Sequence, residues 1–373
     1  MQKDEKKLKD EDNDHGCAKL GKEAASMLYY KTVPEDDPYN DLWNSPEWLF
    51  PFENKDKLIF PKILTVEPVN ICQNECIYCG MRLMNRKTGF MTAEIMKKIA
   101  DEAALYECSI RFGGFGEPLI HKEMVEFARI CKDRKVRATI FTNAKLLNED
   151  MMKAFCEMGL DEIRISSAGI SEAEHKDIRR NSDWNKDFLE KILMADRIKR
   201  QQKADKPYLT LHTCVFDYDK NDFKQNVDIY VKHFLRYVDK VNIDLINLCR
   251  VKDLEKIRDY YPRSTIREIY KPCVTLYHKM LIHWNGDVFA CDLSYNYDER
   301  YYCGNIRDKV PIYEMYHSEK VKKLREMTES LQHAKLPHCK ECFQSTYKYE
   351  ELKEKYKKEA VMKTLAKKNE IIK

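Results

Sequence analysis

The 373-residue sequence contains no long apolar run, and this absence limits where the protein can work. No stretch approaches the ~20 consecutive apolar residues that a membrane-spanning helix requires. The first sixteen residues, MQKDEKKLKDEDNDHG, lack the apolar centre of a secretory signal peptide. We therefore expect a cytoplasmic protein with no membrane partner.

An excess of charge of one sign is also missing, although charged residues make up 34% of the chain. The 66 basic and 62 acidic residues leave a formal net charge of only +4 at pH 7. This balance does not indicate nucleic acid as a partner. The ten histidines include no H-x3-H or H-E-x-x-H pair, so a catalytic zinc site built on histidine is not indicated.

Cysteine, by contrast, is abundant, with 14 copies in the chain. In a reducing cytoplasm such thiols do not build a disulfide framework, and clustered thiols more often bind metal. Seven have the spacing of metal ligands: Cys72, Cys76, Cys79, Cys273, Cys291, Cys339 and Cys342. The other seven are scattered singly along the chain, as small buried apolar residues usually are.

From residue 62 onward, apolar β-branched runs alternate with amphipathic segments of helical period. Six βα repeats with right-handed crossovers predict an α/β fold, a partial (β/α)6 TIM-like barrel. Such folds carry their chemistry at the carboxyl ends of the strands. The predicted strands are 62–69, 109–114, 136–143, 161–167, 208–216 and 240–248, and the predicted helices include 93–105, 122–134 and 187–201.

The alternation stops after residue 270. A β-hairpin is predicted over 281–292, turning at Asn285-Gly286, and a helix over 318–331, which together indicate a small C-terminal α+β domain. The sequence thus predicts four segments: a polar and aromatic arm (1–60), the barrel (61–268), the small cysteine-bearing domain (269–349) and a charged helix (350–373).

The segment VNICQNECIYCGM places Cys72, Cys76 and Cys79 within eight residues, directly after the first predicted strand. Three thiolates of one loop can hold three corners of a four-iron cluster and leave the fourth iron open. A closed zinc site would need a fourth ligand nearby, and a redox C-x-x-C pair would leave Cys72 without a role. These two remain the less favoured alternatives.

This spacing, with Tyr78 before the last cysteine, resembles the signature of the radical S-adenosylmethionine (SAM) enzymes. The segment GFGEPLIH, after the second strand, is similar to the Gly-Glu-Pro segment with which the family binds the SAM amino group. The matching positions are Gly114, Gly116 and Glu117.

Two later segments extend the resemblance. TNA, at the end of the third strand, is similar to the family's Thr-Asn-Gly near the ribose, at Thr142 and Asn143, with Ala144 in place of the glycine. ISSAG and HKDIRR place Ser166 and Arg179 at positions that hold the ribose or the carboxylate in the family, while an alanine replaces its usual aspartate.

The resemblance implies SAM and a [4Fe-4S] cluster on Cys72, Cys76 and Cys79 as cofactors, and a flavodoxin- or ferredoxin-type protein as the reductant. Reductive cleavage of SAM by a low-potential cluster would give a 5′-deoxyadenosyl radical, which removes hydrogen from an unactivated carbon. The barrel would orient the substrate and exclude water.

The C-terminal cysteines resemble the SPASM domain or its shorter twitch form. In this pattern Cys273, Cys291, Cys339 and Cys342 hold an auxiliary [4Fe-4S] cluster. No cysteine follows Cys342, so we expect the twitch form with one auxiliary cluster. Spacing alone leaves a four-cysteine zinc site open.

Asp292 directly follows Cys291, and the resemblance to sulfatase-maturing relatives implies that it takes the proton from the oxidised carbon. A surface aspartate is the alternative. We expect an oxidoreductase that dehydrogenates a C–H bond of a small polar substrate, such as a sugar or aminocyclitol, while the auxiliary cluster accepts the electron. The 60 residues before the first strand are too short and polar for a leader-peptide module, which favours a small substrate.

Three alternatives remain. An epimerase would need a thiol hydrogen donor, for which Cys249 and Cys214 are candidates. A peptide-modifying enzyme, acting by crosslinking or maturation, is the second. A zinc-binding interaction protein is the third, although it leaves the motifs at the strand ends unexplained.

Overall fold

The computed structural model describes a large part of the chain, including every predicted cluster cysteine. Cys249 and the predicted C-terminal helix (350–373) lie outside the described residues. These residues are 28–31, 37–43, 45–49, 51, 54–215, 223–245, 272–339 and 342.

The centre of the described part is one ten-stranded sheet with the order β1-β9-β8-β6-β5-β4-β2-β10-β11-β12. The strands from β2 to β9 in this order run parallel, which confirms the predicted α/β partial barrel. The bounds are β1 Leu28–Lys31, β2 Ile63–Val66, β4 Ser109–Phe112, β5 Ala138–Thr142, β6 Glu162–Ala168, β8 Tyr208–Val215, β9 Lys240–Leu245, β10 Lys279–Ile282, β11 Asp287–Phe289 and β12 Tyr302–Asn305.

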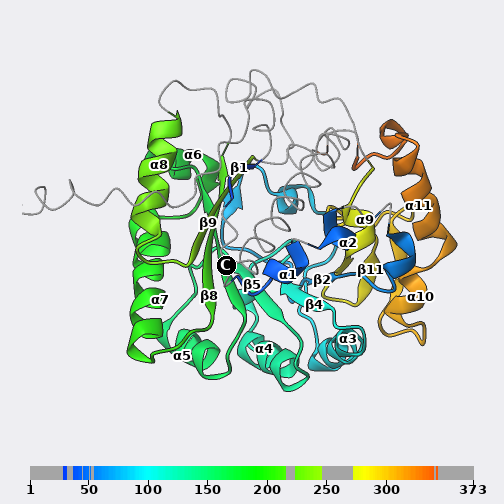
Figure 1. The fold of residues 1–373 in the computed structure, drawn as a ribbon, viewed down its shortest axis with the longest axis horizontal. Helices are drawn as coiled ribbons and strands as arrows, with labels where there is room; N and C mark the ends of the chain where they lie inside the picture. The colour runs from blue at the N-terminus through cyan, green and yellow to red at the C-terminus, as the bar shows by residue number, and fades with distance from the viewer. Residues whose placement is uncertain are drawn as a thin grey trace, which may run out of the picture.

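Helices line the outside of this curved sheet, from α3 round to α8 (Figure 1). Several start at a residue whose side chain caps the first turn: Thr92 accepts from the amide of Ile95, and Asn148 from that of Met151. The bounds are α3 Ala93–Leu105, α4 Met124–Asp133, α5 Glu149–Glu157, α6 Glu172–Ile178, α7 Glu190–Gln201 and α8 Phe223–Phe234, with a π-helical turn η6 (Trp184–Leu189) before α7.

The two faces of the sheet differ in chemistry, because successive side chains of a strand point to opposite sides. On the outer face, Leu64, Ile110 and Ile163 are fully buried in the core that packs against the helices. The alternate residues form the inner face, and they are mostly polar: Thr65, Arg111, Thr139, Glu162, Arg164, Ser166, Thr210, His212, Lys240, Asn242 and Lys279.

The C-terminal segment completes this sheet instead of forming a separate one. Strand β10 pairs in parallel with β2, so the sheet runs across the boundary predicted at residue 268. The hairpin β10–β11 turns at Asn285-Gly286, with Gly286 at φ +88°, as predicted. The predicted helix 318–331 is also confirmed, as α11 (Glu319–Glu329), preceded by α9 (Thr275–His278) and α10 (Ile312–Tyr316).

The N-terminal arm covers the amino ends of the parallel strands. The Asp37 carboxylate forms an ion pair with Lys240 at the start of β9, and both side chains are 1% exposed. The Tyr39 hydroxyl hydrogen-bonds the Thr139 hydroxyl at 2.6 Å. Trp48, in α2 (Pro46–Leu49), stacks on His278 with ring centroids 4.3 Å apart. In the described residues, no helix is long and apolar enough to span a membrane.

The buried Asp37–Lys240 pair leads to a stability prediction. Asp37→Asn keeps an acceptor for the Tyr39 amide but leaves the Lys240 ammonium buried without its ion-pair partner. We expect it to lower the free energy of unfolding by about 3–5 kcal/mol in anaerobic urea denaturation. Adding Lys240→Met should recover most of the loss. If Asp37→Asn alone were as stable as the parent protein, Asp37 and Lys240 would not form a charged pair shielded from water.

Candidate active site

The three-thiol loop follows β2 at the carboxyl ends of the parallel strands, where the fold predicts a site. Cys76 lies in the short strand β3 (Glu75–Cys76), which pairs with β7 (Arg179–Arg180) so that Cys76 faces Arg179. Burial raises the pKa of Cys72 to about 12, and the negative charges of Glu117, Cys76 and Cys79 add to this rise. The three thiols therefore share one electrostatic environment, which a bound cation would stabilise.

Side chains at the two ends of this loop hold it in place. The Asn70 side-chain amide donates to the Lys87 carbonyl at 2.9 Å, and its oxygen accepts from the Gly89 amide at 2.9 Å. Glu67 and Arg86 form a buried two-point ion pair, with one contact of 2.7 Å. These contacts close the base of the loop, so the cysteines do not depend on the cluster alone for their placement.

Two donors point at the sulfur of Cys72. The Asn74 amide lies 3.4 Å from it, and the Asn143 side-chain amide lies 3.6 Å from it. Hydrogen bonds to ligand sulfurs are among the factors that set the potential of an iron–sulfur cluster. We refer to Cys72, Cys76 and Cys79 as the tripod, and to residues 70–89, which carry them, as the tripod loop. Asn143, predicted as a SAM contact, is therefore also placed to affect the potential of a cluster bound by the tripod.

The backbone geometry of the GFGEP segment requires glycine at two positions. A Cβ on Gly116 would lie 2.0 Å from the Val69 carbonyl oxygen, so only glycine allows this loop to approach the end of β2. Gly114 has a φ of +95°, which side chains rarely adopt. The close approach brings the segment beside the start of the cysteine loop, because Val69 lies three residues before Cys72.

Glu117 ties two of the predicted motifs together. One carboxylate oxygen accepts from the Thr142 hydroxyl at 2.5 Å and the other from the Asn143 amide at 2.8 Å. Burial raises the pKa of Glu117, while these hydrogen bonds and the charge of Arg179 oppose the rise. The side chain thus joins the segment after β4 to the end of β5 by hydrogen bonds, a role that the motif alone does not reveal.

Arg179 brings the remaining predicted residues together. Its guanidinium donates to the carbonyl of Ser166 at 2.6 Å and to the Ser166 hydroxyl at 2.7 Å, and it hydrogen-bonds Tyr78. Burial alone would lower the pKa of Arg179, but the charges of Cys76 and Tyr78 outweigh it and raise the pKa. The predicted SAM contacts therefore surround the tripod, and their roles toward SAM stay predictions.

The four C-terminal cysteines also gather: Cys273 precedes α9, Cys291 follows β11, and Cys339 and Cys342 lie in the segment after α11. Burial raises the pKa of Cys273 to about 11, with Cys342 adding to the rise, and Cys339 and Cys273 act on Cys291 in the same direction. The Leu293 amide lies 3.4 Å from the Cys291 sulfur. The Tyr301 hydroxyl hydrogen-bonds Cys339. The four predicted ligands thus form one thiol-rich site.

The donor type of the two cysteine sets bears on the metal. Both sets consist of thiols alone, the donors that hold iron–sulfur clusters and that also bind zinc. Within the described part of the chain, no three Cys, His, Asp or Glu side chains are grouped to hold a single metal ion. The donor sets therefore fit iron–sulfur clusters, and family membership decides between these clusters and zinc.

Asp292 reaches the inner face of the sheet. Its carboxylate accepts from the Arg111 guanidinium at 2.8 Å and lies 3.5 Å from the Lys279 ammonium. Burial and the charge of Arg111 lower the pKa of Lys279 to about 8, and Asp292 acts in the opposite direction. The prediction of a mere surface aspartate is thus disfavoured, since this carboxylate lies among inner-face charges.

Sequence reasoning missed Arg111 and Lys279. The signal was present as polar residues at alternate positions of β4 and β10, SIRF and KMLI, but alternation does not tell which face lines a site. Of the candidate hydrogen donors, Cys214 lies on the inner face of β8, with its sulfur 3.7 Å from the His212 ring nitrogen. Cys249 is outside the described residues.

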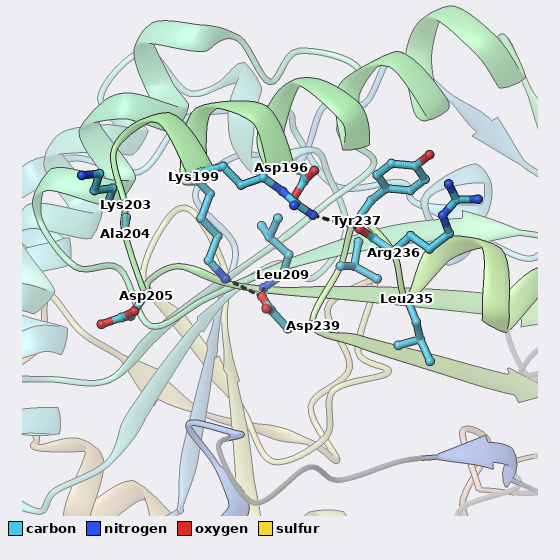
Figure 2. A pocket seen from close by; sticks show the side chains of 12 residues that line it. Asp196, Lys199, Lys203, Ala204, Asp205, Leu209, Leu235, Arg236, Tyr237 and Asp239 are labelled. Atoms are coloured by element: carbon cyan, nitrogen blue, oxygen red, sulfur yellow. Dashed lines mark hydrogen bonds and ion pairs between the residues drawn. The ribbon is translucent and has the colours of Figure 1, made fainter. Parts of the chain in front are cut away.

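A surface groove at the amino ends of β8 and β9 has no part in this site (Figure 2). Its charges are paired locally, with Lys199 2.6 Å from Asp239 and Arg200 2.7 Å from Asp196. No cysteine lines the groove, and both cysteine sites lie elsewhere in the fold. It is a solvated charged surface.

Comparison with known families agrees with both cysteine sites. The family model described as the radical SAM superfamily matches residues 66–198, and the SPASM model, described as an iron-sulfur cluster-binding domain, matches 273–343. The chain belongs to the radical SAM superfamily. This assignment confirms SAM and [4Fe-4S] clusters as the cofactors of this radical SAM protein and sets aside the zinc-binding interaction protein.

Relatives of this radical SAM protein differ in what their names state. An uncharacterized protein of Methanocaldococcus jannaschii is 30% identical over 215 residues, 52% of this chain and 67% of the relative. A tungsten-containing aldehyde ferredoxin oxidoreductase cofactor-modifying protein of Pyrococcus furiosus is 24% identical, over 75% and 87% of the two chains. The structure of Streptococcus suis SuiB bound to precursor peptide SuiA has a TM-score of 0.56 at 16% identity, over 79% and 74%, which shows a shared fold.

The close approach at Gly116 yields a prediction for this radical SAM site. In Gly116→Ala the new Cβ would collide with the Val69 carbonyl, so the cysteine loop should shift. We expect anaerobically reconstituted protein to lose about four of its roughly eight irons. Gly113→Ala is the matched control, because its Cβ would meet only Phe141 at an ordinary 3.4 Å. Full iron content in both variants would contradict the steric argument.

Ala144, where the radical SAM family has glycine, has a φ of +67°. This left-handed conformation costs an alanine roughly 1–2 kcal/mol, part of which is offset because alanine loses less entropy on folding than glycine. Ala144→Gly should therefore raise the free energy of unfolding by up to about 1 kcal/mol in urea denaturation. Ala138→Gly, at a buried strand position of β5, should lower it. Equal losses in both variants would show that Ala144 is unstrained.

Proposed function

We propose that this protein is a radical SAM oxidoreductase that dehydrogenates a C–H bond of a small polar substrate, such as a sugar or aminocyclitol. The observation that carries this proposal is the polar inner face of the sheet. Charged and hydroxyl side chains occupy alternate positions from β10 through β9, between the cysteine loop at the carboxyl ends and the arm at the amino ends.

A polar substrate suits the inner face of the sheet better than an apolar one. Glu162 is engaged by Arg164 at 2.9 Å, Thr210 at 2.7 Å and Thr139 at 3.0 Å, so its charge is already compensated. Arg111 also donates to the Thr65 hydroxyl at 2.8 Å. A substrate with several hydroxyl or amine groups can form further hydrogen bonds with such a polar surface, whereas an apolar substrate would dehydrate it without forming any.

Asp292 is the proposed proton acceptor. Arg111 and Lys279 contact its carboxylate and orient it on the inner face. With a pKa of about 8, Lys279 can exchange a proton near neutral pH, so we assign it to pass on the proton that Asp292 receives. Asp292 directly follows Cys291 in the chain, which supports proton removal close to the proposed electron acceptor.

SAM bound at the tripod supplies the removal of a hydrogen atom from an unactivated carbon. Asp292 then takes one proton, and the four auxiliary cysteines hold the group that takes one electron. Loss of a hydrogen atom, a proton and an electron amounts to dehydrogenation. A flavodoxin- or ferredoxin-type protein is the proposed reductant. We propose that the protein holds a single auxiliary cluster, as the twitch form does.

The proposal is tested with a panel of sugars, aminocyclitols, nucleosides and peptides under anaerobic conditions. We expect one deoxyadenosine for each small polar product that has lost two hydrogens. Turnover of a peptide alone would favour the peptide-modifying alternative, in keeping with the peptide bound to SuiB. Solvent deuterium in a product of unchanged mass formula would favour an epimerase, with Cys214 or Cys249 as donor.

Asp292→Asn tests the proton acceptor. The variant keeps the size of the side chain but removes its basicity, so substrate oxidation should fall about 10²–10⁴-fold. Deoxyadenosine formed without substrate should stay near the parental amount, because the tripod is untouched. Asp308→Asn, on the exposed turn after β12, is the matched control. Normal substrate oxidation by Asp292→Asn would remove the assignment.

A further inference from the structure

A continuous line of aromatic rings joins the two cysteine sites. Phe115 and Tyr295 lie edge to face with ring centroids 5.9 Å apart. Tyr295 lies 5.9 Å from the His338 ring, and His338 stacks on Tyr301 at 4.5 Å with the planes only 7° apart. We refer to Phe115, Tyr295, His338 and Tyr301 as the ring line. Its members come from segments nearly 225 residues apart in sequence, so no local pattern indicates it.

One end of the ring line touches the tripod loop. Gly80 directly follows Cys79, and a Cβ on Gly80 would lie 3.0 Å from the Tyr295 ring and 3.1 Å from the Phe115 ring. Both rings are therefore in van der Waals contact with the backbone beside a tripod ligand. Phe115 is fully buried, so solvent does not separate it from the loop.

The other end touches the auxiliary site. His338 directly precedes Cys339, and the Tyr301 hydroxyl hydrogen-bonds the Cys339 thiol. Tyr301 is 1% exposed, so burial raises its pKa, and the nearby thiols of Cys339 and Cys291 add to this rise. The ring line therefore ends against two auxiliary ligands.

Groups other than the Tyr295 ring also hold the two segments together. The Tyr295 carbonyl accepts from the Arg86 guanidinium at 2.7 Å. Asn296 accepts from the Asn85 amide at 2.7 Å and donates to the Leu83 carbonyl at 3.0 Å. These bonds fasten the auxiliary segment to the tripod loop through backbone and amide groups, which leaves the ring itself open to substitution.

We propose that the ring line is the path along which one electron passes between the auxiliary cysteine site and the tripod. Electron tunnelling weakens steeply with distance and most steeply across unfilled gaps, and closely packed rings leave no such gap. No bond forms or breaks in this step: the group at the auxiliary cysteines loses one electron and the group at the tripod gains it.

Only the direction of transfer rests on the proposed function. During substrate oxidation, the electron left after loss of the hydrogen atom and the proton enters at the auxiliary cysteines and returns to the tripod. Without substrate, dithionite or a flavodoxin-type reductant supplies it. The path itself requires only two occupied cysteine sites.

Tyr295→Leu tests the ring line without any substrate. Holoprotein is reduced with dithionite, freed of excess reductant and mixed with SAM, whose cleavage oxidises the tripod side. Freeze-quench electron paramagnetic resonance then follows the loss of the auxiliary signal. We expect Tyr295→Leu to slow this loss at least tenfold, with iron content and both midpoint potentials unchanged. Tyr295→Phe, which keeps the ring, should behave as the parent.

Tyr297→Leu is the matched control, since this tyrosine is 56% exposed and lies off the ring line. His338→Leu interrupts the line between Tyr295 and Tyr301 and should reproduce the slowing if Tyr295→Leu fails to retain iron. Parental rates in an iron-replete Tyr295→Leu or His338→Leu protein would overturn the path. Loss of iron in both variants would also overturn it, because the rings would then be structural. Failure to find an oxidised substrate would instead count against the proposed function alone.

Discussion

The placement of both cysteine sites depends on one buried ion pair, between Glu67 at the end of β2 and Arg86 in the tripod loop. Glu67 also accepts from the amides of Phe115 and Trp284, at 3.3 and 3.4 Å, so one carboxylate joins the barrel, the GEP segment and the C-terminal hairpin. Burial raises the pKa of Glu67, and Arg86 opposes this rise. A buried pair of this kind specifies an arrangement more than it adds stability.

The contrast between the two sheet faces explains how one fold supports both a core and a site. The outer face supplies the apolar contacts with the helices. The inner face is then free to carry charges such as Arg111 and Glu162, which are compensated by Asp292 and Arg164, respectively. Asp292 enters this face from the C-terminal segment because β10 adds to the edge of β2.

Much of this organisation could be predicted from the sequence, because it rests on short-range patterns. Helix α3 occupies the predicted residues 93–105, and the six predicted strands are present within a few residues of their bounds. The pairing of β10 with β2 was not predicted, since the strands are more than 200 residues apart and each reads only as a short apolar run. The hydrogen bonds of Glu117 to the end of β5 were likewise not predicted, because the Gly-Glu-Pro motif does not indicate what the carboxylate binds.

The amino-acid sequence by itself determined the two thiol sets, the alternation of strands and helices, and the membership of the radical SAM superfamily. These follow from ligand spacing and hydrophobic period, which are properties of neighbouring residues. Only the tertiary structure decided that Asp292 lies between Arg111 and Lys279, and that aromatic rings link Gly80 to Cys339. Contacts of this range arise when the sheet closes around its inner face, and no local pattern encodes which distant side chains then meet.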